Sequence, residues 1–387
     1  MEHLRQDDPA LIGPYVTLAG LDARDDGRPV PDRRYVARSA DGERTVIACV
    51  PRADADPARW AEEARQARGL SVPGFLPVAE AVDATHGPGG FPWYAAAYAP
   101  VLPLPAALAA HGGPLPERYV RALGAALAGA LAVAHARGVT HAGVSPSAVL
   151  LTSGGPWLAG FGAVRAAGPD GPGREGPGHE GLGNVGPGGL EPGSLAPEQL
   201  TGGRPRPLGD VYGLGTVLSY ASTGHVVPES AELPAALRPL VTACLARDPA
   251  ARPDAARVAA ELGAGSGPRT TGADPRASGF DARATGVDPR ASGFDARATG
   301  VDPRASGFDP RATGVDPRAS GFDPRVIGGD PRTGGVPGMA RVPEATVLDA
   351  AFPVPPPPRI VAELVRLSAA VLAAELPIST TVPTARG

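Results

Sequence analysis

The spacing of apolar and polar residues changes near residue 100. Before this point, apolar residues come in short alternating runs that are typical of strands. Residues 34–39 and 43–50 lie on either side of Asp41-Gly42, a dipeptide that favours a hairpin turn, so we expect two antiparallel strands there. Three further runs predict strands, at residues 12–20, 76–83 and 91–100.

Helical patterns interrupt and then replace these strands. Residues 57–69 predict a helix, because Asp56 can cap its amino end and Gly69 can stop it. Past residue 100, an Ala- and Leu-rich run at residues 115–137 predicts a long helix that ends at Gly138. The pattern therefore indicates an α+β fold with a small β-rich part followed by a helical part.

The last third of the chain has a different pattern. From Asp274 to Val336 a seven-residue unit repeats nine times, and most units contain both Pro and Gly, which excludes a helical coiled coil. We expect an extended, disordered, low-complexity linker. Residues 360–376 then predict an amphipathic helix that is too short and too charged to span a membrane, so it should dock on a partner or pack on a core.

Composition narrows the class of protein. Among 387 residues, 53 Gly and 47 Pro indicate long irregular segments, while a net charge of −4 argues against nucleic acid and anionic membranes as partners. Two cysteines are too few for a disulfide framework, and the first residues lack the apolar core of a signal peptide. We expect a cytoplasmic protein without a transmembrane segment, and no metal site, because the His and Cys spacing fits none.

Two linked motifs lie in the middle of the chain. Residues 141–151 read His-Ala-Gly-Val-Ser-Pro-Ser-Ala-Val-Leu-Leu, and residues 158–162 read Leu-Ala-Gly-Phe-Gly. They resemble the catalytic loop H-R-D-L-K-P-x-N-V-L-L and the D-F-G motif of the bacterial Ser/Thr protein kinase family, with His141, Phe161 and Gly162 in register.

This resemblance implies a two-lobed protein-kinase-like fold. It covers residues 12–263, with an N-lobe over 12–100 and a C-lobe over 101–263. The remaining ranges are an amino-terminal extension at 1–11, the repeat linker at 264–340, and a Pro-rich segment with the short helix at 341–387.

The positions that carry chemistry in the family hold other residues here. Phosphoryl transfer needs a carboxylate to accept the hydroxyl proton and oxygen ligands for Mg²⁺. In the catalytic loop, the resemblance places the base at Gly143, the Lys at Ser145 and the metal-binding Asn at Ala148. It places the magnesium Asp at Gly160 and the ATP-binding Lys at Cys49. The chain contains no lysine at all, so we expect no catalytic residue and no cofactor; the site residues do not support ATP binding. Cys49 itself fits a small apolar filler or, alternatively, a reactive thiol.

Other family positions keep their residue types. The resemblance places Glu63 at the glutamate of the first helix, where, with no Lys to pair with, it should be solvated or bound to an Arg. It makes His141 structural, Asp210 an anchor in a later helix, and Glu198 and Arg252 a buried ion pair. A short stretch between residues 224 and 240 implies that the family's substrate-docking helix is reduced.

The repeats offer a separate hypothesis. Each of seven hydroxyl residues follows an Arg by two positions, so that a phosphate added there could pair with Arg or recruit a partner. These possible phosphoacceptors are Ser278, Thr285, Ser292, Thr299, Ser306, Thr313 and Ser320.

Three functions remain in competition. The first is a pseudokinase, a catalytically inactive homologue that scaffolds or allosterically regulates a protein partner, for example an active Ser/Thr kinase. The second is an enzyme that binds nucleotide with atypical chemistry. The third is an adaptor whose repeat tail is a phosphoacceptor or docking array.

Overall fold

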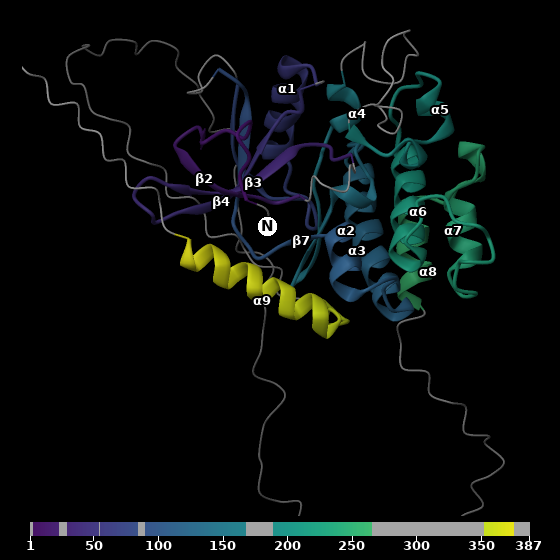
Figure 1. Ribbon diagram of the computed structural model, residues 1–387. Helices are drawn as coiled ribbons and strands as arrows, with labels where there is room; N and C mark the ends of the chain where they lie inside the picture. Colours follow the sequence, from purple (N-terminus) through teal and green to yellow (C-terminus); the bar gives the residue numbers. More distant parts are fainter. Residues whose placement is uncertain are drawn as a thin grey trace, which may run out of the picture. The chain divides into compact units, whose positions relative to one another are not determined.

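The computed structural model describes residues 3–22, 29–53, 55–83, 90–167, 189–264 and 352–374. The N-lobe is a six-stranded antiparallel sheet in the order β1-β2-β3-β4-β6-β5, with one helix, α1 (Pro57–Gly69), packed beside it (Figure 1). Its strands are β1 (Leu11–Ile12), β2 (Tyr15–Gly20), β3 (Arg33–Ser39), β4 (Thr45–Val50), β5 (Val78–Val82) and β6 (Trp93–Ala97).

The predicted hairpin is confirmed. The first predicted strand is wrong, because the structure has two strands where the sequence predicts one continuous strand. β3 and β4 pair on either side of the expected turn. The run at 12–20 instead turns at Gly13 into two strands, because Gly13 has φ +57° and a Cβ there would lie 2.3 Å from the Trp93 ring. The close approach of this indole requires glycine and breaks the strand.

Helix α1 begins as its sequence predicts. The Asp56 carboxylate accepts the backbone N–H groups of Ala58 and Arg59, each at 3.0 Å. The helix includes Gly69 as its last residue, and the chain leaves it at Leu70.

The C-lobe is helical and begins with a small three-stranded sheet, β7-β8-β9. These strands are β7 (Leu102–Pro103), β8 (Val149–Thr152) and β9 (Gly155–Leu158). The helices are α2 (Leu104–His111), α3 (Glu117–Ala136), α4 (Ala163–Ala166), α5 (Pro197–Leu200), α6 (Pro207–Thr223), α7 (Arg238–Cys244) and α8 (Ala255–Ala264). Short 3-10 helices are η1 (Pro146–Ala148), η3 (Pro192–Ser194) and η4 (Pro249–Ala251).

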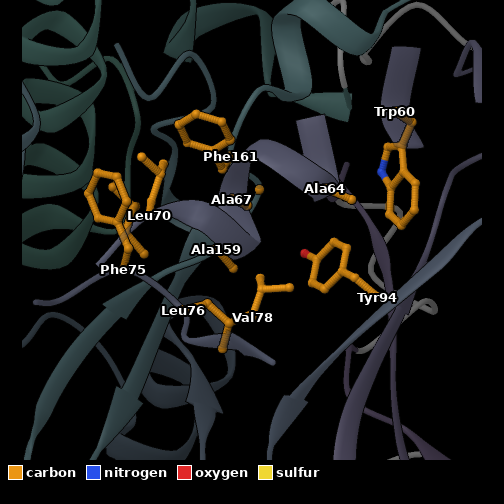
Figure 2. Close-up of a pocket in the computed structure, with 12 residues that line it drawn as sticks. Trp60, Ala64, Ala67, Leu70, Phe75, Leu76, Val78, Tyr94, Ala159 and Phe161 are labelled. Atoms are coloured by element: carbon orange, nitrogen blue, oxygen red, sulfur yellow. The ribbon is translucent and has the colours of Figure 1, made fainter. Parts of the chain in front are cut away.

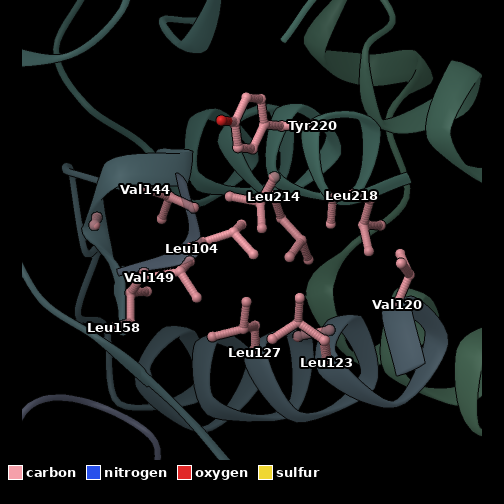
Figure 3. Packing of buried hydrophobic residues seen from close by; sticks show 14 of the residues in the cluster. Leu104, Val120, Leu123, Leu127, Val144, Val149, Leu158, Leu214, Leu218 and Tyr220 are labelled. Carbon is pink, nitrogen blue, oxygen red and sulfur yellow. The ribbon is translucent and has the colours of Figure 1, made fainter. Parts of the chain in front are cut away.

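The C-lobe core is built around α3, which is the long helix that the sequence predicts. Leu123 and Leu127 of α3 face Leu214 and Leu218 of α6 (Figure 3). Gly124 allows this approach, since a Cβ there would lie 2.5 Å from the Leu218 side chain. By length and composition alone α3 could span a membrane, but 56% of its most apolar window is buried inside the protein, as expected of a core helix.

A last helix, α9 (Pro358–Ala373), belongs to the same compact unit as the two lobes. The helix forms where the amphipathic pattern predicts it, and its apolar face packs on the kinase-like domain. Of the two predicted roles, docking on a partner and packing on a core, the structure shows packing on a core. The predicted end at Leu376, the repeats and all seven possible phosphoacceptors lie outside the described residues.

Candidate functional site

The position that the resemblance assigns to the family's ATP-binding lysine holds a buried thiol. Cys49 lies on β4 with no exposed surface. Burial raises the pKa of this thiol, and the nearby Asp32 raises it further, so the thiolate that a reactive cysteine needs is disfavoured. This environment fits the apolar filler and not the reactive thiol.

The catalytic loop and the Gly-Phe-Gly motif lie in direct contact. An ideal Cβ on Gly143 would lie 1.9 Å from the carbonyl oxygen of Gly160. Gly160 itself has φ +74°, and a Cβ there would lie 2.7 Å from Pro31. Backbone and proline atoms therefore fill the space into which a side chain at either glycine would project.

The remaining two loop positions are also enclosed. Ala148 is fully buried, and the Ser145 hydroxyl is buried without a hydrogen-bond partner among the described residues. In the described part of the chain, no group of three or more His, Cys, Asp or Glu side chains is placed to hold a metal ion.

A cation that the sequence reasoning missed crosses the cleft. Arg34 on β3 has no exposed side-chain surface; its Nε donates to Asp22 at 2.8 Å, and its Nη2 donates to the carbonyl of Ser147 in the catalytic loop at 2.9 Å. Burial opposes the charge of Arg34, but the charge and hydrogen bond of Asp22, together with smaller contributions from other nearby groups, raise the pKa of Arg34. A hairpin that turns at Asp41-Gly42 pairs Arg34 with Cys49 across the two strands. This register could have identified Arg34 from the sequence as the cation beside the lysine position.

A buried carboxyl fixes α1 to the sheet. Asp32 accepts a hydrogen bond from Trp60 Nε1 of α1 at 2.7 Å and one from the Tyr94 hydroxyl of β6 at 2.8 Å. Burial raises the pKa of Asp32. This contact positions α1 without any lysine–glutamate pair.

Glu63 has an arginine partner. Arg165 of α4 donates Nε and Nη2 to its two carboxylate oxygens, both at 2.7 Å, and Nη1 to the carbonyl of Thr140 at 3.0 Å. Glu63 is buried, so of the two predicted outcomes pairing is observed and solvation is wrong. Gly162 lies against this carboxylate, since a Cβ there would be 2.2 Å from Glu63 Oε2.

His141 is buried and packed between aromatic rings. Its ring lies edge-on to Phe75 at 4.9 Å and to Phe161 at 5.7 Å between centroids, and within the described ranges neither ring nitrogen makes a hydrogen bond of ordinary geometry. Burial lowers the pKa of His141 to about 4. Asp210 of α6 accepts the backbone N–H groups of His141 and Ala142, at 2.7 and 2.8 Å, and so holds the start of the loop.

The predicted ion pair of the C-lobe forms. Arg252 donates to both carboxylate oxygens of Glu198, at 2.7 and 2.8 Å. Arg252 is completely buried, but the Glu198 side chain is 29% exposed, so the expectation of a fully buried pair is wrong on the glutamate side. Between α6 and α7, within the described range 189–264, the chain forms no helix, in agreement with the reduced docking region.

An apolar pocket lies between α1, Tyr94 of β6 and the Gly-Phe-Gly motif. Figure 2 shows Trp60, Tyr94, Phe75 and Phe161 around it. Its lining offers no charged group to a phosphate.

Comparisons with known proteins place the chain in a family, although no family model matches it. It is 33% identical over 285 residues to the probable serine/threonine-protein kinase PkwA of Thermomonospora curvata, a match covering 68% of this chain and 35% of that protein. It is 30% identical over 283 residues to the serine/threonine-protein kinase AfsK of Streptomyces coelicolor, covering 68% of this chain and 33% of that protein. The chain thus spans about a third of the length of these curated relatives.

The fold comparison agrees with these relatives. A mutant kinase domain of Mycobacterium tuberculosis PknI matches with a TM-score of 0.50 and 23% identity, covering 66% of this chain and 97% of that domain. This likeness shows the two-lobed kinase fold. The sequence identities with PkwA and AfsK show that the chain belongs to the bacterial serine/threonine protein kinase family.

Proposed function

We propose that this protein is a pseudokinase, a kinase homologue that transfers no phosphoryl group and acts by binding another protein as a scaffold or allosteric regulator. The observation that carries the proposal is the contact of Gly143 with the Gly160 carbonyl. The positions for the base and for the magnesium carboxylate lack an oxygen and also lack the space to hold one.

The cleft does not fit the family's cofactor, ATP with Mg²⁺. Cys49 is a buried, neutral thiol where a cation would meet the phosphates, and Gly160 and Ala148 supply no metal ligand. Among the described residues, the buried cation on this wall is Arg34, and its charge is already paired with Asp22. A triphosphate entering here would have to displace that carboxylate.

Arg34 also gives the second candidate function its only support. If Asp22 moved away, the guanidinium could meet a phosphate from the strand beside the usual one. This would make the protein a nucleotide-binding homologue with atypical chemistry. The adaptor hypothesis rests on residues outside the described ranges and stays a prediction.

A thermal-shift titration separates these functions. The purified chain is titrated with ATP to millimolar concentration, with and without Mg²⁺ or Mn²⁺, beside an active kinase domain as positive control. Ligand at 100 times its Kd stabilises a protein by about 2.7 kcal/mol, which for this size means a rise in Tm of roughly 5–11 °C. The pseudokinase proposal predicts no rise and no transfer of labelled phosphate.

A nucleotide-dependent rise that Arg34→Met abolishes, and that the exposed-site control Arg118→Met leaves intact, would favour the second candidate. Phosphate transfer that disappears in Glu63→Gln would refute the pseudokinase proposal. The proposed regulation of a partner is tested by measuring the phosphorylation rate of a copurifying Ser/Thr kinase with and without this chain. A phosphorylation rate that does not change would count against regulation.

A further inference from the structure

Helix α9 packs on the C-lobe through one apolar face. The side chains of this face are buried at the spacing of successive helical turns: Ile360, Leu364, Leu367 and Val371. They lie against α2 and β7, and Figure 1 shows α9 in yellow beside these elements. At the amino end of α9, Arg359 Nη1 donates to the carbonyl of His111, at the end of α2, at 3.0 Å.

The residues that lead into α9 add a second contact with the C-lobe. The Phe352 ring lies edge-on to Tyr119 of α3, with 5.8 Å between centroids. It also covers Gly155, where a Cβ would lie 3.1 Å from the ring. The segment is therefore anchored on the C-lobe before the helix begins.

The carboxy end of α9 is bound by the other lobe. Arg38 of β3 donates Nη1 to the carbonyl of Ala374 at 2.8 Å and contacts the carbonyl of Val371 through Nη2. The last carbonyls of a helix lack partners within the helix and carry its negative dipole end, so a guanidinium is well suited to them. One helix thus contacts both lobes.

Strand β3 also contacts the C-lobe through Arg34, which lies on the same face of the strand as Arg38. Arg34 and Arg38 are four residues apart, and side chains at even spacing on a strand point to one face. Arg34 reaches the catalytic loop at Ser147, while Arg38 reaches α9.

We propose that α9 is an interlobe brace, which holds the N-lobe at a fixed position on the C-lobe without a bound nucleotide. The four buried aliphatic side chains supply the attachment to the C-lobe, and Arg38 transmits it to β3. Dissociation of α9 would free the lobes to change their relative angle and would uncover an apolar groove on α2 and β7. The inference does not depend on whether the protein transfers phosphate.

The test measures the distance between the lobes in the full chain. Spin labels are placed at Glu43→Cys in the N-lobe and Arg204→Cys in the C-lobe, both at exposed positions. The two native cysteines are buried and should not react. Pulsed electron paramagnetic resonance then gives the distance distribution, and hydrogen exchange of the α9 amides reports whether the helix is attached.

Two substitutions on one helix form a matched pair. Leu364→Asp puts a charge on the buried face, and Val365→Asp puts the same charge on a side chain that is 63% exposed. We expect Leu364→Asp to speed exchange in α9 at least tenfold and to broaden the distance distribution at least twofold, and Val365→Asp to do neither. Both are also measured with Arg34→Leu, so that the cleft contact cannot mask the effect.

A third variant keeps the proposal testable if Leu364→Asp does not fold. Arg38→Ala removes the hydrogen bonds from β3 to the carboxy end of α9, together with one from Arg38 to Thr45 inside the N-lobe, and leaves the apolar face of α9 unchanged. The distribution should therefore broaden while α9 stays protected on the C-lobe. An unchanged distribution after α9 has lost protection would overturn the brace. Unchanged α9 protection in a folded Leu364→Asp chain would overturn the docking itself.

Discussion

Adding one methyl group at Gly143 should destabilise the protein strongly. The Cβ of Gly143→Ala would lie 1.9 Å from the Gly160 carbonyl oxygen, whereas nonbonded heavy atoms attract best at about 3.5 Å. The two segments must separate by roughly 1.5 Å. They are joined by backbone hydrogen bonds, from Gly162 N to the carbonyl of His141 at 2.8 Å and from Val164 N to that of Ala142 at 2.9 Å, which resist this.

Overpacking a core costs about 1–3 kcal/mol. The obstacle at Gly143 is backbone and not the end of a flexible side chain, so we expect a loss in the free energy of unfolding of about 3 kcal/mol, at the upper end of that range. For a domain of this size, the loss corresponds to a fall in Tm of roughly 6–12 °C. Gly143→Asp should lose at least as much and should restore no phosphate transfer.

Urea denaturation of the two variants beside a matched control measures the effect. Gly129 of α3 has open space around its Cβ position, so Gly129→Ala should be neutral or stabilise by up to about 1 kcal/mol through helix propensity. If Gly143→Ala were as stable as Gly129→Ala, the loop would be open and the main support for the pseudokinase proposal would be lost.

Two further predictions concern buried charge. The pKa of His141 is about 4 in the folded state and near 6.5 when unfolded, so the unfolded chain takes up the proton first as the pH falls. The free energy of unfolding should therefore fall by up to roughly 3 kcal/mol between pH 6.5 and pH 4. Below pH 4 this residue should cause no further loss. Urea midpoints across this range should vary less in His141→Phe; equal pH slopes would contradict the burial argument. Arg252→Leu should cost about 3 kcal/mol, because it strands Glu198 and several carbonyls, whereas Arg257→Leu at an exposed pair should cost much less; similar Tm values for the two would refute this.

Local signals predicted local structure well. The helix at α1 begins where Asp56 caps it, and the β3–β4 hairpin follows from two turn residues. The resemblance to the kinase family also predicted the anchoring role of Asp210 and the pairing of Glu198 with Arg252. In each case neighbouring residues, or a fixed pattern, carry the information.

Contacts between distant parts of the chain could not be predicted in the same way. The residues next to Gly13 in the sequence do not indicate that Trp93 packs against it. The sequence left the partner of Glu63 open among many arginines, and only the fold selects Arg165. The pattern of α9 shows that it has an apolar face, but not which surface that face covers.

The anchoring of α9 has a topological consequence. Helix α8 ends the kinase-like region at Ala264, and the described chain resumes at Phe352, which is fixed to the same compact unit. Ala264 and Phe352 therefore both belong to one compact unit, although 87 residues separate them in the sequence. A protease that cut the chain once between them would produce two polypeptides on a denaturing gel but a single particle in native chromatography. A partner bound to the repeats would stay tethered through two chain paths, and one cut would not release it.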